Sequence, residues 1–90
     1  MNMNIEIVEW VDSTGVHGWQ KATEMREVEM LSPTTIGFVF HETDAALYLT
    51  PTHDGQEGDA LRVDDTIIIP KVSILSRRII DVATAPQPGD

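Results

Sequence analysis

The chain has 90 residues, of which 41% are hydrophobic and 23% charged, and this favours a single small globular domain. Fifteen acidic residues against six basic ones give a net charge of -9, which disfavours binding to nucleic acid phosphates and to anionic membranes. Cysteine is absent, which excludes disulfides, thiol catalysis and cysteine-ligated metals.

The N-terminal segment MNMNIEIVEW has no basic region and reaches an acidic residue at Glu6, unlike a secretion signal. No apolar run approaches the roughly 20 residues that a membrane-spanning helix needs. We therefore expect a cytoplasmic protein without a membrane partner.

The first predicted strand is NIEIVEW, residues 4–10. Ile5 and Ile7 share one face of this strand, whereas Val8 and Trp10 share the other. This switch indicates a bulge, or a strand that is covered on both faces.

Two glycines predict a loop over residues 11–19. Residues 20–30 then show apolar side chains at a spacing of three to four, which predicts one short helix of two or three turns. Ser32-Pro33 would end it, because the residue before a proline disfavours helical geometry.

Residues 34–42 and 45–51 predict a β-hairpin with a tight turn at Glu42-Thr43-Asp44. Alternate apolar residues in the two strands predict one shared face. Its expected members are Ile36, Phe38 and Phe40 from the first strand and Ala45, Leu47 and Leu49 from the second.

Residues 51–62 hold two glycines, a proline and three acidic residues, which predicts a mobile loop, the longest of the fold. Residues 66–70, TIIIP, predict an apolar strand that ends at Pro70, because proline has no N–H for the ladder. A one-turn helix over Lys71–Ser73 would then redirect the chain.

Residues 76–82 predict a last strand that closes on the first one, with Val72 or Ile74 returning to the core. The fold class is therefore mainly β: a small, strongly bent, five-stranded barrel with one short helix after the first strand. We expect one domain over residues 1–83 and a disordered Pro-rich tail over residues 84–90.

The segment IIIPKVSI, residues 67–74, resembles the part of Src-homology-3 domains where a strand ends at Ile-Pro, makes one 3-10 turn and re-enters as the closing strand. The hairpin TIGFVFHETDAALYL, followed by VSILSRRII, resembles an Sm-like barrel in its central glycine and tight acidic turn. The layout over residues 5–75 is similar to small proteins of bacteriophages and prophages. These resemblances imply a small Src-homology-3-like or Sm-like barrel of viral origin, and they imply no catalytic chemistry.

Each tryptophan would remove about 150–250 Å² from water if it were buried. We expect Trp10 in the core, at the end of the first strand. Trp19 has two interpretations, a plug of the barrel or an exposed binding aromatic.

Ser13, His17 and Asp12 have the side chains of a nucleophile, its base and the acid that orients the base. The segment Asp12-Ser13-Thr14-Gly15 is well explained as a turn, and nothing places Ser13 on a strained elbow, so we expect no enzyme activity. His41 and His53 have acidic neighbours but lack the spacing of metal ligands, so we expect neither a metal nor a cofactor.

Lys71, Arg77 and Arg78 supply half of the basic residues within eight positions. They predict a local anion or phosphate site, or a basic edge strand that resists aggregation. Arg77 and Arg78 would point to opposite faces of a strand.

The leading functional hypothesis is a non-catalytic phage-type module that engages or inhibits a host protein, in counter-defence or host takeover. An acidic surface would suit a basic partner. The first alternative is an oligomeric protein that sequesters a small nucleotide signal, with Trp19 and Tyr48 stacking the base and Lys71, Arg77 and Arg78 holding phosphates. The second is a minor virion or assembly component.

Overall fold

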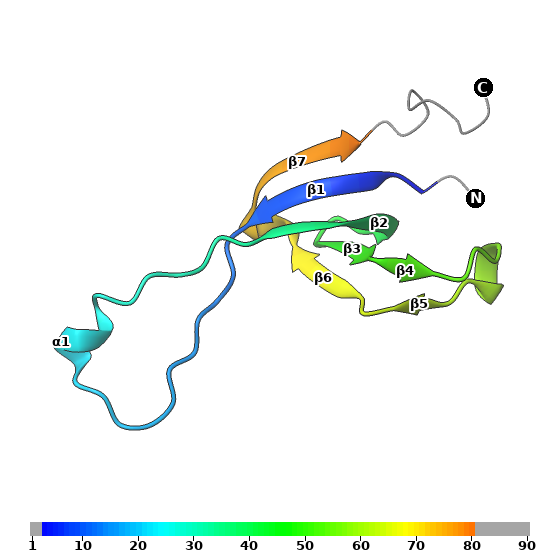
Figure 1. Cartoon of the computed structure of the whole chain (residues 1–90). Helices are drawn as coiled ribbons and strands as arrows, with labels where there is room; N and C mark the ends of the chain where they lie inside the picture. The colour runs from blue at the N-terminus through cyan, green and yellow to red at the C-terminus, as the bar shows by residue number, and fades with distance from the viewer. Residues whose placement is uncertain (1–2, 81–90) are drawn as a thin grey trace, which may run out of the picture.

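The computed structural model describes residues 3–80, and its main body is an antiparallel sheet. The sheet strands are β1 (Ile5–Trp10), β2 (Thr34–Glu42), β3 (Ala46–Thr50), β6 (Ile67–Pro70) and β7 (Ile74–Ile80). Their order across the sheet is β6-β3-β2-β1-β7, as Figure 1 shows. The prediction of a mainly β fold with five main strands is confirmed, and so is the pairing of the last strand with the first.

Five fully or nearly fully buried apolar side chains form the core on one face of this sheet. They are Val8, Trp10, Leu47, Leu49 and Ile69. Val8 and Trp10 alternate along β1 with residues that face away, and the leucines do the same along β3. Period-two alternation therefore decides which face of the sheet is buried.

The predicted shared face of the hairpin is wrong. Leu49 lies opposite Val39 rather than Phe38, and Ile36 is 57% exposed. A register shift between Val39 and His41 changes the alternation near the turn. The core face of β2 therefore carries Val39, while Ile36 lies on the other face.

Gly37 explains why β2 can lie so close to β3. A Cβ atom at this position would be 2.9 Å from the carbonyl oxygen of Thr50 and 3.4 Å from the Cβ of Leu49. Only a residue without a side chain fits this approach without displacing its neighbours.

The predicted helix over residues 20–30 shrinks to α1 (Ala22–Met25), a correction to the sequence-based expectation. No side chain caps its N-terminus, and none of its residues is buried. A helix of this length gains little from its own hydrogen bonds and has no apolar surface to pack against. Of the residues with helical spacing, only Ala22–Met25 form a helix, which is about one turn long.

The longest excursion from the sheet is not the segment after residue 50, as expected, but residues 11–33, which we call the arm. The arm leaves the sheet after β1, carries α1 at its far end and returns to β2 (Figure 1). Its two limbs meet at the base, where Asp12 N–H donates to the carbonyl of Leu31 at 2.9 Å.

Residues 51–66 form a narrow projection on the opposite side, which we call the finger. It contains β4 (Thr52–His53), the 3-10 turn η1 (Gly58–Ala60) and β5 (Val63–Asp64), so the predicted loop is partly a second, two-stranded sheet. Thr50 anchors it, because its buried hydroxyl oxygen lies 2.7 Å from the carbonyl oxygens of both Thr52 and Asp64.

The predicted one-turn helix over Lys71–Ser73 is confirmed as the 3-10 turn η2. Its first residue donates from its backbone N–H to the carbonyl of Ala45 at 2.8 Å, and its last accepts from Val11 N–H at 2.8 Å. Ile74 packs against the core after this turn, whereas Val72 is 97% exposed.

Within residues 3–80 no backbone ladder joins β6 to β7, so the sheet keeps two edges. The arm and the finger also make the chain elongated, 60 × 30 × 24 Å, with a radius of gyration of 17.5 Å. A compact domain of this length would have a radius of gyration of about 12 Å. The expected tail, residues 84–90, lies outside the described residues.

Candidate functional site

The arm presents a fully exposed aromatic side chain, Trp19, whose exposed fraction is 103% against 8% for Trp10. Trp10 closes one end of the core and donates from its indole Nε1 to Thr35 Oγ1 at 3.0 Å. The prediction that Trp10 is structural is confirmed. The interpretation of Trp19 as a plug is wrong, and Trp19 is a surface aromatic.

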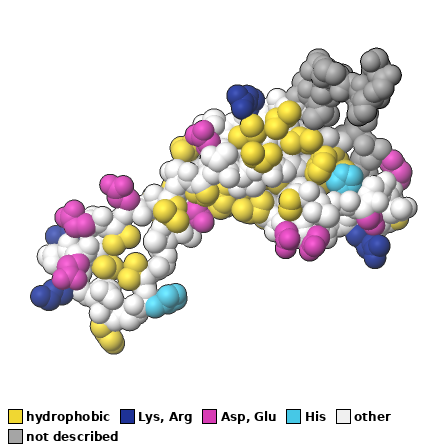
Figure 2. Space-filling view, in the orientation of Figure 1, with side chains coloured by type: hydrophobic (Ala, Val, Ile, Leu, Met, Phe, Trp, Pro, Cys, Tyr) yellow, Lys and Arg dark blue, Asp and Glu magenta, His cyan; other side chains and the backbone are white. Residues whose placement is uncertain are grey.

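The curve of the arm forms an open hollow of about 340 Å³. Its lining comes from the chain on both sides of α1 and from the end of α1 itself: Thr14, Val16, Met25, Val28, Glu29 and Met30. Figure 2 shows hydrophobic side chains gathered on the arm, away from the sheet. The arm therefore combines a hollow of mixed polar and apolar lining with an exposed indole that is not part of that lining.

The arm also carries charges of both signs near α1. The basic ones are Lys21 and Arg26, and the acidic ones are Glu24, Glu27 and Glu29. No ion pair or side-chain hydrogen bond involves any of these five in the part of the chain that the structure describes. Their charges are consequently free to meet a partner.

A second group of charged residues lies on the core face of the sheet and is fully paired. Arg77 of β7 makes a bidentate ion pair with Glu6, with Nε and Nη2 each 2.8 Å from a carboxylate oxygen. The same guanidinium also donates to Glu42 at 3.1 and 3.2 Å, and Lys71 lies 2.7 Å from Glu42. We call these four residues the ion network.

Glu6 is 3% exposed, so its carboxylate would be costly to bury without Arg77. Hydrogen bonds from Arg77, followed by one from Lys71, lower the pKa of Glu42 to about 2. Hydrogen bonds to Glu6 and Glu42 raise the pKa of Arg77 further above its ordinary value. These shifts favour the charged forms of Glu42 and Arg77, and the network joins β1, β2, β7 and η2.

The five residues predicted to bind a ligand are not brought into one site. Trp19 lies on the arm, while Lys71 and Arg77 belong to the ion network. Tyr48 lies in β3, edge-on to the rings of Phe40 and His41 with centroids 6.1 and 4.9 Å away.

Arg78 lies opposite Ile7 of β1, whereas Arg77 lies opposite Val8. Directly opposed residues share a face, so the two arginines point to opposite sides of the sheet, as the sequence predicted. Within residues 3–80, Arg78 has no ion pair. It is the one basic residue of β7 that remains open to a partner.

The residues considered for catalysis all lie on the arm. Asp12 is half-buried at its base, and Ser13 and His17 are exposed. Among the described residues no side-chain hydrogen bond links them, so the structure does not assemble a nucleophile with its base.

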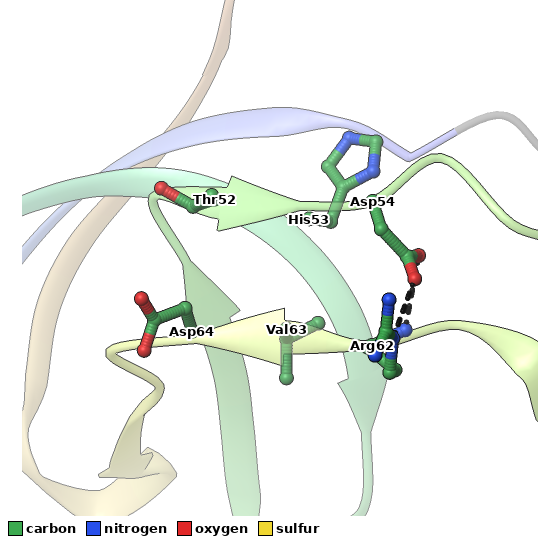
Figure 3. Close-up of a pocket in the computed structure, with 6 residues that line it drawn as sticks. All are labelled: Thr52, His53, Asp54, Arg62, Val63 and Asp64. Atoms are coloured by element: carbon green, nitrogen blue, oxygen red, sulfur yellow. Dashed lines mark hydrogen bonds and ion pairs between the residues drawn. The ribbon is translucent and has the colours of Figure 1, made fainter.

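A hollow of about 510 Å³ lies in the finger (Figure 3). Two of its charged side chains bind each other: Asp54 accepts from Arg62 through backbone N–H and Nε, at 3.1 and 3.0 Å. These bonds lower the pKa of Asp54 to about 2. His53 accepts from Gly55 N–H at its Nδ1 and lies edge-on to Phe38 at 4.6 Å. Three of the side chains that line the hollow are thus bonded to other parts of the finger itself.

The outer edge of β7 forms a further exposed apolar surface. It includes Val72 of η2 and Leu75, Arg78 and Ile79 of β7, and we call these four residues the β7 edge. Val72, Leu75 and Ile79 are 97%, 60% and 57% exposed. Since β7 pairs with no strand but β1 in the described part of the chain, its other side offers backbone groups that no described strand pairs with.

Among residues 3–80, no helix is long and apolar enough to cross a membrane. No group of three or more His, Cys, Asp or Glu side chains there is placed to hold a metal ion.

Sequence reasoning missed the ion network and most of the apolar arm. Glu6 shares the face of Val8 and Trp10, so the alternation of β1 already placed one carboxylate on the buried face. That carboxylate required a cation, and Arg77 was available on the closing strand.

Comparison of the chain with protein-family models, with curated proteins and with solved structures finds no match. Its functional interpretation therefore depends on its own geometry.

Proposed function

We propose that this protein is a non-catalytic module that binds another protein, and that the partner is a host protein met in the cytoplasm of a phage-infected cell. The carrying observation is that ten large hydrophobic residues are exposed among residues 3–80, whereas five are buried. Five of the exposed ones lie on the arm and three on the β7 edge. Exposed apolar side chains that occur together are typical of interaction sites.

The β7 edge is the surface that we assign to the host partner. An extended segment of the partner would add a strand next to β7, with main-chain hydrogen bonds for affinity. Val72 and Leu75 would then supply apolar contacts at one end of the strand, and Arg78 a charged contact near the other.

The charge of the chain favours a basic partner. With a net charge of -9, the protein would attract a positively charged surface at long range and accelerate the encounter. Its own basic residues on the sheet face are neutralised in the ion network, which leaves the acidic field dominant.

We further propose that the bent sheet is a Src-homology-3-like barrel and that the protein is of phage origin. The strand order and the 3-10 turn between β6 and β7 support the first point. The similarity of the layout over residues 5–75 to small phage proteins supports the second.

A nucleotide-binding function receives less support. Of its three expected phosphate ligands, Lys71 and Arg77 already bind carboxylates, and Arg78 faces the other side of the sheet.

The proposal is tested by affinity capture from host lysate with three forms of the chain. The wild type should retain a stoichiometric protein, and the double substitution Val72→Asp/Leu75→Asp should lose it. Because both side chains are exposed, the substitutions should leave the fold intact. Ile36→Asp is the matched control, since Ile36 is 57% exposed but lies in a central strand. Failure of the wild type to retain any protein in repeated captures would argue against the proposal, as would equal retention by the double variant.

A further inference from the structure

We propose that the arm is a self-association element: the arms of two copies of this chain pair about a two-fold axis, and Trp19 of each copy enters the hollow on the arm of the other. This inference goes beyond the proposed function, because it concerns a different surface and a different partner.

The first support is the position of Trp19. Its indole is 103% exposed and makes no hydrogen bond among the described residues, so water surrounds it on all sides. Burial of a tryptophan removes about 150–250 Å² from water, and exposed tryptophans are enriched among the residues that dominate interfaces.

The second support is the hollow on the same arm. At about 340 Å³ it falls within the size range of sites that enclose small aromatic groups. Val16, Val28 and Met30 line it, and methionine adapts its shape to an inserted ring. Trp19 does not line the hollow of its own arm, so its indole is available to the hollow of a second copy.

The third support is the charge pattern around α1. Lys21 and Arg26 stand beside Glu24, Glu27 and Glu29, and none of the five is paired within the described residues. In an antiparallel pair of arms, basic residues of one copy face acidic residues of the other. The like net charge of the two chains opposes association, and these local pairs offset it where the arms touch.

These features together favour a second copy over an unrelated partner. A two-fold interface uses the same patch on both subunits, so that patch must carry both the projecting group and its receptor, and both signs of charge. The arm carries all of them within residues 14–30. It also projects away from the sheet, as Figure 1 shows, so two arms can approach without contact between the sheets.

Sedimentation velocity of the purified chain over a wide range of concentration tests the proposal. We expect a reversible monomer–dimer equilibrium for the wild type. Trp19→Ala should weaken the dimer by at least about 30-fold, as truncation of an interface hot spot does, without altering the far-UV circular dichroism. Val72→Ala is the control on the β7 edge and should dimerise like the wild type.

A charge exchange identifies the surface independently of Trp19. Lys21→Glu/Arg26→Glu makes the arm acidic, and Glu24→Lys/Glu27→Lys makes it basic. Each double variant alone should be monomeric, and an equimolar mixture should restore a dimer. Fluorescence gives a third readout: in a Trp10→Phe background, the emission of Trp19 should shift to the blue as concentration rises.

A wild type that stays monomeric up to its solubility limit would overturn the proposal. So would a Trp19→Ala dimer of unchanged affinity, or a dimer that Val72→Ala disrupts. These outcomes are distinct from failure of the proposed function, because the β7-edge variant should lose the host protein and stay dimeric, whereas Trp19→Ala should become monomeric and keep its β7 edge.

Discussion

Single residues in this chain hold together segments that are far apart in sequence. Arg77 is separated from Glu6 by 71 positions and from Glu42 by 35, yet its guanidinium binds both carboxylates. Glu6 lies in the buried face of β1, where water cannot replace a lost partner. The neighbouring Arg78 has the same side chain on the opposite face and binds neither of these residues.

This contrast predicts different costs for two adjacent substitutions. Arg77→Ala should lower the free energy of unfolding by about 3 kcal/mol, because it leaves the Glu6 carboxylate buried and unpaired. Arg78→Ala should change it by less than about 0.5 kcal/mol, as is usual for surface positions. Urea denaturation at neutral pH measures both, and equal losses would contradict the role given to Arg77.

Gly37 provides a second prediction at this scale. In Gly37→Ala the new Cβ would lie 2.9 Å from the backbone carbonyl of Thr50, so β2 and β3 would have to separate. We expect a loss of about 1–3 kcal/mol, as for other overpacked positions. Gly15→Ala on the arm is the control, because no atom lies within 4 Å of its Cβ; comparable thermal shifts for the two variants would refute the argument.

At the level of elements, ion pairs rather than a backbone ladder connect the end of β2 to η2 and to β7. Glu42 receives hydrogen bonds from Arg77 and Lys71 and is the residue they share. Because these bonds lower the pKa of Glu42 from 4.5 to about 2, they favour its ionised form in the folded protein. Their contribution to stability is therefore complete above pH 4.5 and is lost as the pH falls towards 2.

The Glu42→Gln variant should remove part of this acid dependence. We expect it to be less stable than the wild type at neutral pH, and the difference should shrink as the pH falls below 4.5. Guanidinium chloride would screen the ion pairs, so urea unfolding at several pH values is the suitable measurement. Asp44→Asn, in the adjacent turn, serves as a control; a constant gap between Glu42→Gln and the wild type would contradict the linkage.

The same scale shows which elements the sequence could predict. Alternating apolar residues and Pro70 were sufficient for β1, β2, β3, β6 and η2, because these signals are local. The helix was overestimated, because the spacing over residues 20–30 says nothing about whether the sheet offers a surface for packing. The buried face of β2 was wrong because the shift between Val39 and His41 depends on the pairing with β3.

The candidate site was less predictable than the fold. Trp19 was identified from its residue type. Whether it is a plug or an exposed aromatic depends on whether the arm packs on the sheet or projects from it, and the local sequence does not determine this. The ion network was missed because Arg77 and Glu6 meet only when the last strand pairs with the first. Residue types therefore indicated which residues were candidates, whereas the pairing of distant strands determined which of them lie together.

For the molecule as a whole, the sheet and the arm are largely independent structures. Within the arm only Met25 of α1 and the residues near its base are even half-buried, and the base itself is held by the hydrogen bond from Asp12 to Leu31. The core residues all lie in β1, β3 and β6. The stability of the fold thus owes little to the arm.

Replacement of residues 13–30 by a short Gly-Ser linker should therefore leave the sheet folded. The ends of the excised segment are already adjacent, so loop closure costs little, and a shorter loop lowers its entropy cost slightly. Far-UV circular dichroism and the urea midpoint should stay close to those of the wild type, while the dimer is lost. Unfolding of the shortened chain would show that the arm is part of the core.

The ladder between β1 and β7 has a consequence for how the protein is made. It joins residues 5–10 to residues 74–80. Almost all of the described chain must therefore be synthesised before β7, the second neighbour of β1, leaves the ribosomal exit tunnel. During that interval Glu6 has no Arg77, and the apolar side of β1 has only β2 beside it. Cooperative folding of this sheet should accordingly follow translation rather than accompany it, and nascent chains arrested before residue 74 should remain protease-sensitive.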